Sequence, residues 1–160
     1  MRKNSVPILL SCCLFVMPIL AGAQTTRKAG LWELTTTQTF QQSPFPTGAA
    51  GTRTAPVCLT QQQIDRYGAI VPQIRSCQVT NVVKKANGMT ADMVCTGVMS
   101  GKGTLQSDST DGVHATGKVH FVGSMQVGSS TKPMEWTTLS SAIFRGADCG
   151  DVKPVPVPDN

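Results

Sequence analysis

Apolar and polar residues alternate with a period of two over most of the chain. The clearest run is residues 113–122, where Val, Ala, Gly, Val and Phe occupy every second position and His, Thr, Lys and His lie between them. Successive side chains of a β-strand point to opposite sides of the sheet, so this pattern predicts a strand with one buried face. The same period recurs over residues 31–40, 89–99 and 132–145. Within each run the larger apolar residues are expected to share one face: Trp32, Leu34 and Phe40; Met89, Ala91, Met93, Cys95 and Met99; Val119 and Phe121; Met134, Trp136 and Phe144.

Turn residues separate these runs and indicate how the strands connect. Asn87-Gly88 suits the positive backbone angles of a tight hairpin between residues 78–85 and 89–96. Residues 101–103 and Asp111-Gly112 predict the next two reversals, with a strand over residues 104–109 between them. Short strands at such spacing are typical of meanders, sandwiches and barrels. We expect an all-β fold, a single antiparallel meander that forms a curled or closed up-and-down barrel.

Three segments depart from the alternation. Residues 60–67 predict one short helix, with Thr60 as N-cap, Gln63 at the capping-box position and Gly68 at the end. Residues 41–56, with three prolines and two glycines, predict a long exposed loop. Residues 153–160 alternate proline and valine, which predicts a disordered, untethered tail of extended polyproline character.

The first 23 residues have the organisation of a secretory signal peptide. Arg2 and Lys3 precede an apolar run over residues 6–20, and Ala21-Gly22-Ala23 supplies the small residues of a cleavage site before Gln24. Lipidation at Cys12 is the alternative, but it would leave an apolar core of only about five residues. We therefore expect residues 1–23 to be removed, residues 24–152 to form the β domain, and the protein to reach the periplasm with no integral membrane segment.

Four cysteines remain in the mature domain: Cys58, Cys77, Cys95 and Cys149. An even number in an exported chain predicts two disulfides, for which three connectivities exist. Cys77 and Cys95 flank the Asn87-Gly88 turn on adjacent strands, so we favour Cys77–Cys95 with Cys58–Cys149. A strict register leaves Cys77 about two residues from facing Cys95, so the hairpin needs a bulge or a longer loop. Zinc is the alternative, but the short C-x2-C spacing of structural zinc sites does not occur.

Charge and candidate chemistry exclude several functions. The chain has 14 Lys and Arg against 9 Asp and Glu, and its only adjacent basic pairs after the leader, Arg27-Lys28 and Lys84-Lys85, are expected on solvated surface rather than on a nucleic-acid interface. No G-x-S-x-G motif occurs, so we expect no enzyme. His114 and His120, the only histidines, lie about 20 Å apart on one strand and cannot chelate one ion. We expect no metal and no cofactor.

Five methionines allow two interpretations, a copper site or an apolar core or cavity: Met89, Met93, Met99, Met125 and Met134. Thioethers bind Cu(I) in exported proteins. The wide separation and strand phase of these residues favour a core or an adaptable apolar cavity instead.

Several motifs resemble a known family. These are the opening Gly30-Leu31-Trp32-Glu33-Leu34-Thr35-Thr36-Thr37, the later Val57-Cys58-Leu59-Thr60, the central Cys77, Cys95 and Thr96-Gly97, and the closing Phe144-Arg145-Gly146-Ala147-Asp148-Cys149-Gly150. Together they resemble the exported bacterial family called domain of unknown function 3617, over residues 29–150. The resemblance implies a bacterial periplasmic protein and assigns no catalytic residue.

The opening Gly30-Leu31-Trp32 is also similar to the G-x-W of lipocalin-type barrels, in which an arginine from a late strand covers the tryptophan. Arg145 is the counterpart here. In an up-and-down barrel the first strand pairs with the last, so the start of one meets the end of the other. We therefore expect Trp32 and Arg145 to touch and to close one end of the barrel.

Two function classes follow. The first is a non-enzymatic periplasmic protein that binds a small apolar or lipid-like ligand in the barrel. The alternative is a cell-envelope interaction or structural protein with a filled core; a hydrolase ranks below both. An apolar pocket of about 300 Å³ or more would favour the first, and a packed interior the second. The sequence leaves the oligomeric state open.

Overall fold

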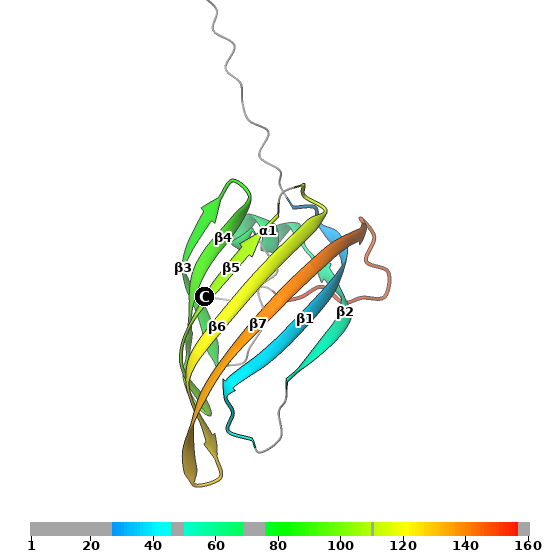
Figure 1. Ribbon diagram of the computed structural model, residues 1–160. Helices are drawn as coiled ribbons and strands as arrows, with labels where there is room; N and C mark the ends of the chain where they lie inside the picture. The colour runs from blue at the N-terminus through cyan, green and yellow to red at the C-terminus, as the bar shows by residue number, and fades with distance from the viewer. Residues whose placement is uncertain (1–26, 46–49, 69–75, 110, 157–160) are drawn as a thin grey trace, which may run out of the picture.

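The computed structural model describes residues 27–45, 50–68, 76–109 and 111–156. Seven antiparallel strands form one curved sheet in the order β2-β1-β7-β6-β5-β4-β3, and a short helix follows β2 (Figure 1). The edges, β2 and β3, are not hydrogen-bonded to each other. The predicted antiparallel meander is therefore confirmed in its curled form rather than as a closed barrel. The elements are β1 (Gly30–Gln42), β2 (Gly51–Leu59), α1 (Gln61–Tyr67), β3 (Cys77–Lys85), β4 (Gly88–Cys95), β5 (Met99–Asp108), β6 (His114–Val127) and β7 (Ser130–Gly146).

The first and last strands pair as an up-and-down arrangement requires. The start of β1 meets the end of β7, and Trp32 lies opposite Phe144. This pairing defines two ends of the molecule. The helix end contains α1, the start of β1 and the β3–β4 turn, and the open end contains the end of β1, the start of β5 and the β6–β7 turn (Figure 1).

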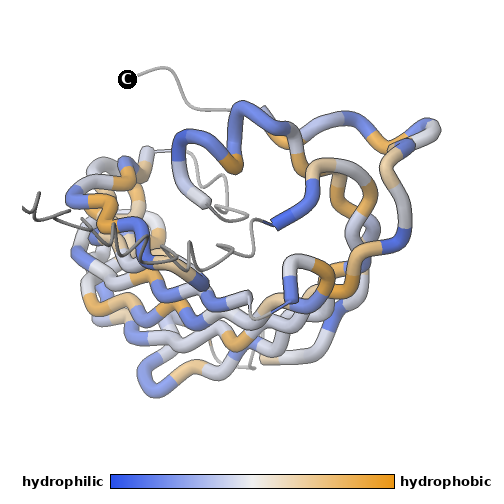
Figure 2. Tube along the Cα trace, turned by 90° about the horizontal axis from the view of Figure 1, so that it is seen from above, coloured by the Kyte–Doolittle hydropathy of each residue, from blue (hydrophilic) through white to orange (hydrophobic). Residues whose placement is uncertain are grey.

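The alternating pattern correctly predicted which side chains face inward. The strands curve around an interior, with α1 beside it (Figure 2). At the helix end, Trp32, Leu59 and Ile64 pack with Ala115 and Ala142 in one buried cluster. A second cluster is formed mainly by β4 to β7: Tyr67, Met89, Ala91, Met93, Cys95, Leu105, Phe121, Met134 and Trp136.

The predicted helix is confirmed with both of its ends. Thr60 is the N-cap and accepts a hydrogen bond from the backbone N–H of Gln63 at 3.2 Å. Gly68 ends the helix in the left-handed conformation (φ 68°), which glycine adopts without steric cost, and donates to the Ile64 carbonyl at 2.7 Å. The side chain of Gln63 does not complete a capping box. It is fully buried, and both of its polar atoms lack a hydrogen-bond partner among the described residues.

The long loop predicted over residues 41–56 is largely wrong. β1 continues to Gln42, and β2 begins at Gly51 and contains Pro56; residues 46–49 lie outside the described part of the chain. Proline is tolerated there because β2 is an edge strand and needs no hydrogen bond on its free side. Hydroxyl pairs at 2.9 Å, Thr35 with Thr54 and Thr37 with Thr52, add to the β1–β2 pairing.

The reversal predicted at residues 101–103 is also wrong, because these residues lie inside β5 and the chain turns before Met99. The glycines have a packing role instead. The ring of Phe121 lies so close to Gly101 and Gly123 that a Cβ at either position would meet its Cζ, at 2.7 and 2.9 Å. The glycines therefore make room for an aromatic ring.

The tail expected to be untethered is attached at its start. Pro154 forms a bridge with Cys58, and the Val155 N–H donates to the Cys58 carbonyl at 3.2 Å. Residues 157–160 lie outside the described part of the chain, as do the expected signal peptide (residues 1–23) and its cleavage site. Among the described residues, no helix has the length and apolar character to cross a membrane.

Candidate functional site

The structure contains both favoured disulfides, one at each end of the sheet. Cys58–Cys149 joins β2 to the segment after β7 at the helix end, with sulfurs 2.04 Å apart. Cys77–Cys95 joins the open-end termini of β3 and β4 at 2.05 Å. A register irregularity between Thr80 and Val83 brings Cys77 opposite Cys95, which supplies the bulge that the hairpin required. Two disulfides are compatible with an exported protein.

The predicted contact between Trp32 and Arg145 is wrong. Arg145 follows Phe144, so its side chain lies on the opposite, outer face, where it donates to Glu33 Oε1 at 2.6 Å. Trp32 is fully buried; its Nε1 donates to the Lys28 carbonyl at 2.9 Å, and its ring meets Phe144 edge-on at 5.5 Å. The cation that does cover Trp32 is Arg27, whose guanidinium carbon lies 5.9 Å from the ring centroid.

An apolar cavity of about 300 Å³ opens at the open end of the inner face. Its walls come from the ends of four strands and from the segment after β1. Trp136 stacks on Phe121 with ring centroids 5.6 Å apart, and Phe45 remains 44% exposed at the rim. The aromatic and thioether side chains that line the cavity are Phe40, Phe45, Met99, Met125, Met134 and Trp136.

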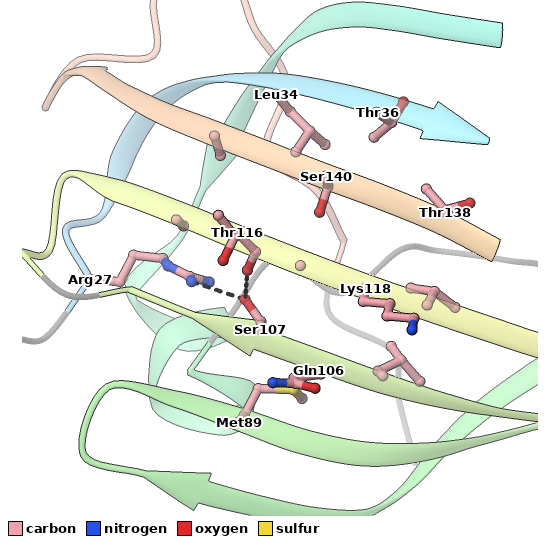
Figure 3. A pocket seen from close by; sticks show the side chains of 15 residues that line it. Arg27, Leu34, Thr36, Met89, Gln106, Ser107, Thr116, Lys118, Thr138 and Ser140 are labelled. Carbon is pink, nitrogen blue, oxygen red and sulfur yellow. Dashed lines mark hydrogen bonds between the residues drawn. The ribbon is translucent and has the colours of Figure 1, made fainter. Parts of the chain in front are cut away.

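A smaller cavity of about 100 Å³ continues along the inner face toward the helix end (Figure 3). It shares Val119 and Thr138 with the open-end cavity, so the two are adjacent. Ala115, Gly117 and Ala142 leave space above the sheet. The inner surface from the open end to the neighbourhood of Arg27 is therefore mainly apolar, with polar side chains at Thr36, Gln38, Thr138 and Ser140.

Arg27 lies at the helix end of the smaller cavity and is only 5% exposed. Its Nη2 donates to the Ser107 hydroxyl at 3.0 Å (Figure 3). It also donates, more weakly, to the Asp108 carbonyl at 3.5 Å. Its Nε is buried and donates to no described residue. Burial lowers the pKa of the guanidinium, and the charge of Asp108 acts in the opposite direction.

A third, polar cavity of about 310 Å³ lies beyond Arg27, between α1 and the β3–β4 turn. Arg27, Lys84, Lys85 and Asp65 all line it. The expectation that Arg27-Lys28 and Lys84-Lys85 lie on solvated surface holds for Lys84 and Lys85, which are exposed. For Arg27 this is wrong, and the only signal in the sequence was its closeness to Trp32.

The histidines lie on the outer face of β6 and are not brought together. His114 Nδ1 bonds Asp111 Oδ2 at 2.5 Å, and this carboxylate also accepts from the backbone N–H groups of Val113 and His114. These bonds lower the pKa of Asp111 to about 2, with the His114 side chain as the largest cause. His120 Nδ1 lies 3.2 Å from the Thr137 hydroxyl. No group of three or more His, Cys, Asp or Glu among the described residues is placed to hold a metal ion.

Comparison with known proteins gives one match. Residues 27–149 match the family described as "Protein of unknown function (DUF3617)". No curated protein and no solved structure matches the chain, so the similarity to lipocalin-type barrels has no structural neighbour behind it. The match spans most of the sequence and nearly all of the curved sheet, and the chain therefore belongs to the DUF3617 family.

Proposed function

We propose that this protein is a non-enzymatic, exported binding protein that holds a small apolar or lipid-like ligand against the inner face of its sheet. The observation that carries the proposal is the apolar cavity of about 300 Å³ at the open end. Small-molecule sites begin at about this volume and are lined mainly by apolar and aromatic side chains. The alternative, an envelope protein with a filled core, predicts a packed interior at this place.

The lining of the cavity also supports a ligand of variable shape. Met99, Met125 and Met134 present flexible, polarisable side chains that adapt to irregular apolar groups. Phe45 at the rim keeps much of its ring in contact with water. An apolar ligand would cover this ring and gain free energy by removing its surface from water.

The length of the apolar surface favours a chain-like ligand. Trp136 in the open-end cavity and Ala142 in the smaller cavity are six residues apart on β7, or about 20 Å along the strand. This length is comparable with that of a long fatty acyl group. The surface is also narrow, because the smaller cavity measures only about 100 Å³.

The two tryptophans of the chain provide a direct test, because Trp136 lines the open-end cavity and Trp32 is buried at the helix end. Trp32→Phe leaves Trp136 as the only tryptophan, and Trp136→Phe leaves Trp32. A long-chain fatty alcohol brominated at mid-chain quenches tryptophan only at short range. We expect saturable quenching at micromolar ligand that is much stronger in Trp32→Phe than in Trp136→Phe.

A matched pair of charge insertions on β6 provides the control. Met125→Glu places a carboxylate in the cavity and should abolish quenching, because an unpaired charge in an apolar site costs several kcal/mol. Val122→Glu places the same group on the outer face, where Val122 is 52% exposed, and should leave quenching unchanged. Absence of quenching in the Trp32→Phe protein, or equal quenching in both glutamate variants, would overturn the proposal.

A further inference from the structure

The guanidinium of Arg27 is a buried charge with incomplete compensation. Buried ionised groups in proteins are normally paired with an opposite charge. Arg27 forms no ion pair among the described residues; it contacts one hydroxyl at 3.0 Å, one carbonyl at 3.5 Å and the face of Trp32, and the charge of Asp108 offsets only part of the effect of burial on its pKa. Asp108 contributes its carbonyl, while its carboxylate accepts from the Gln106 amide at 3.1 Å. The buried Nε has no acceptor among the described residues, so the guanidinium retains an unsatisfied donor and an incompletely compensated charge.

Arg27 lies where an apolar cavity and a polar cavity meet. On one side is the narrow apolar cavity, and on the other the polar cavity of about 310 Å³ beside α1. Lys84 lines the polar cavity and is paired in register with Met89, an inward-facing residue. The one carboxylate that lines the polar cavity, Asp65, already accepts from Gln61 at 2.9 Å. The polar cavity therefore carries an excess of positive charge.

We propose, on the basis of the binding site proposed above, that the ligand is a single-chain amphiphile with an anionic head, a carboxylate or a phosphate. The head binds the Arg27 guanidinium at the helix end, with Lys84 at the rim of the polar cavity. The chain lies along the inner face through the narrow cavity toward Trp136. An oxyanion beside Arg27 would accept from Nε and compensate the buried charge, and charge-assisted hydrogen bonds of this kind are the strong ones.

The test compares an acid with the alcohol of the same chain length. Mid-chain-brominated hexadecanoic acid, hexadecyl phosphate and the matched brominated hexadecanol are titrated into the Trp32→Phe protein, with quenching of Trp136 and direct calorimetry as readouts. We expect the two anions to bind at least about tenfold more tightly than the alcohol, which is the effect of one good charge-assisted hydrogen bond.

Charge-neutralising variants then locate the head. Arg27→Gln should lower the affinity for both anions by about tenfold and leave the affinity for the alcohol unchanged. Lys84→Gln, at an exposed rim position, should produce a smaller loss of the same sign. Lys132→Gln removes the same charge at the open end and is the matched control; it should change neither affinity.

The outcomes separate this inference from the proposed function. If the alcohol binds as tightly as the anions, or if Arg27→Gln and Lys84→Gln bind the acid like the parent protein, the anionic head is overturned and the apolar site remains. If inorganic phosphate or acetate displaces the acid at equal concentration, the site belongs to a free anion and the amphiphile is overturned. If none of the three chains binds, the proposed function itself fails.

Discussion

The helix end and the open end are formed by opposite ends of the same strands, but they differ in how far the apolar side chains are buried. At the helix end, α1 places Ile64 against Trp32 and Leu59, and all three are buried. At the open end, no helix among the described residues covers the strand ends, and Phe45 is 44% exposed beside an apolar cavity of about 300 Å³. Burial of apolar surface stabilises the first arrangement, while the second leaves apolar surface in water. A sheet with uniform alternation thus has one packed end and one end with an open apolar cavity.

Each end also has its own covalent link, and the two links close loops of very different length. Cys58–Cys149 spans 91 residues of sequence and Cys77–Cys95 spans 18. The helix end, where the longer loop is closed, brings together segments that are far apart in the chain. The open end is held by a local hairpin. The helix end is therefore expected to be the more sensitive to loss of its link.

The largest predicted effect comes from removing the two links separately. In the chain-entropy model, replacing both Cys58 and Cys149 with Ala should lower the free energy of unfolding by about 4–5 kcal/mol, and replacing Cys77 and Cys95 by about 3 kcal/mol. Urea denaturation of both double variants under identical conditions measures the difference. A larger loss from the open-end pair would contradict the view that the helix end depends more on long-range closure.

A smaller effect of opposite sign is expected at Gln63. Its amide is fully buried and lacks hydrogen bonds to the described residues, so it retains the desolvation cost without a compensating bond. Gln63→Leu should therefore raise the free energy of unfolding by about 1–2 kcal/mol. Gln62→Leu, on the exposed side of the same helix, is the matched control and should change stability by less than about 0.5 kcal/mol. A loss of stability in Gln63→Leu would show that the buried amide has a partner.

The smallest effect concerns the β5–β6 turn at the helix end and depends on pH. Because the folded-state pKa of Asp111 is lowered to about 2 from 3.8, its contribution to stability is complete above pH 3.8 and disappears as the pH falls to about 2. Asp111→Asn should therefore be slightly less stable than the parent protein at pH 7 and equal to it near pH 2. Thermal denaturation over this pH range measures the convergence; a constant difference would refute it.

Alternation predicted the sheet well because it reports one physical property, the burial of one face. It placed Trp32, Phe121 and Trp136 inside, and the hairpin argument paired the cysteines. It failed for β2, because an edge strand needs neither a buried face nor all its backbone donors and so tolerates Pro56. The same alternation already implied that Arg145, next to the inward-facing Phe144, would point outward; the similarity to lipocalin-type barrels outweighed that signal.

The candidate site was harder to predict than the fold. The open-end cavity depends on how far β1, β5, β6 and β7 extend beyond the last packed layer, which periodicity does not encode. Arg27 lies before the first alternating run, so nothing in the local pattern distinguishes a buried arginine from an exposed one. Its environment is created by Ser107 and Asp108, which are 80 and 81 residues away in the sequence.

The absence of hydrogen bonds between β2 and β3 has a mechanical consequence. A barrel closed by hydrogen bonds has a circumference fixed by its strand number and stagger, so its interior cannot widen without breaking strand pairs. The two edge strands of this sheet are not paired with each other, so the sheet can flatten or tighten by small changes of twist at each strand pair while all of its ladders persist. Under the proposed function, ligands of different width would then be accommodated at an elastic cost, in place of the stepwise cost of lost backbone hydrogen bonds.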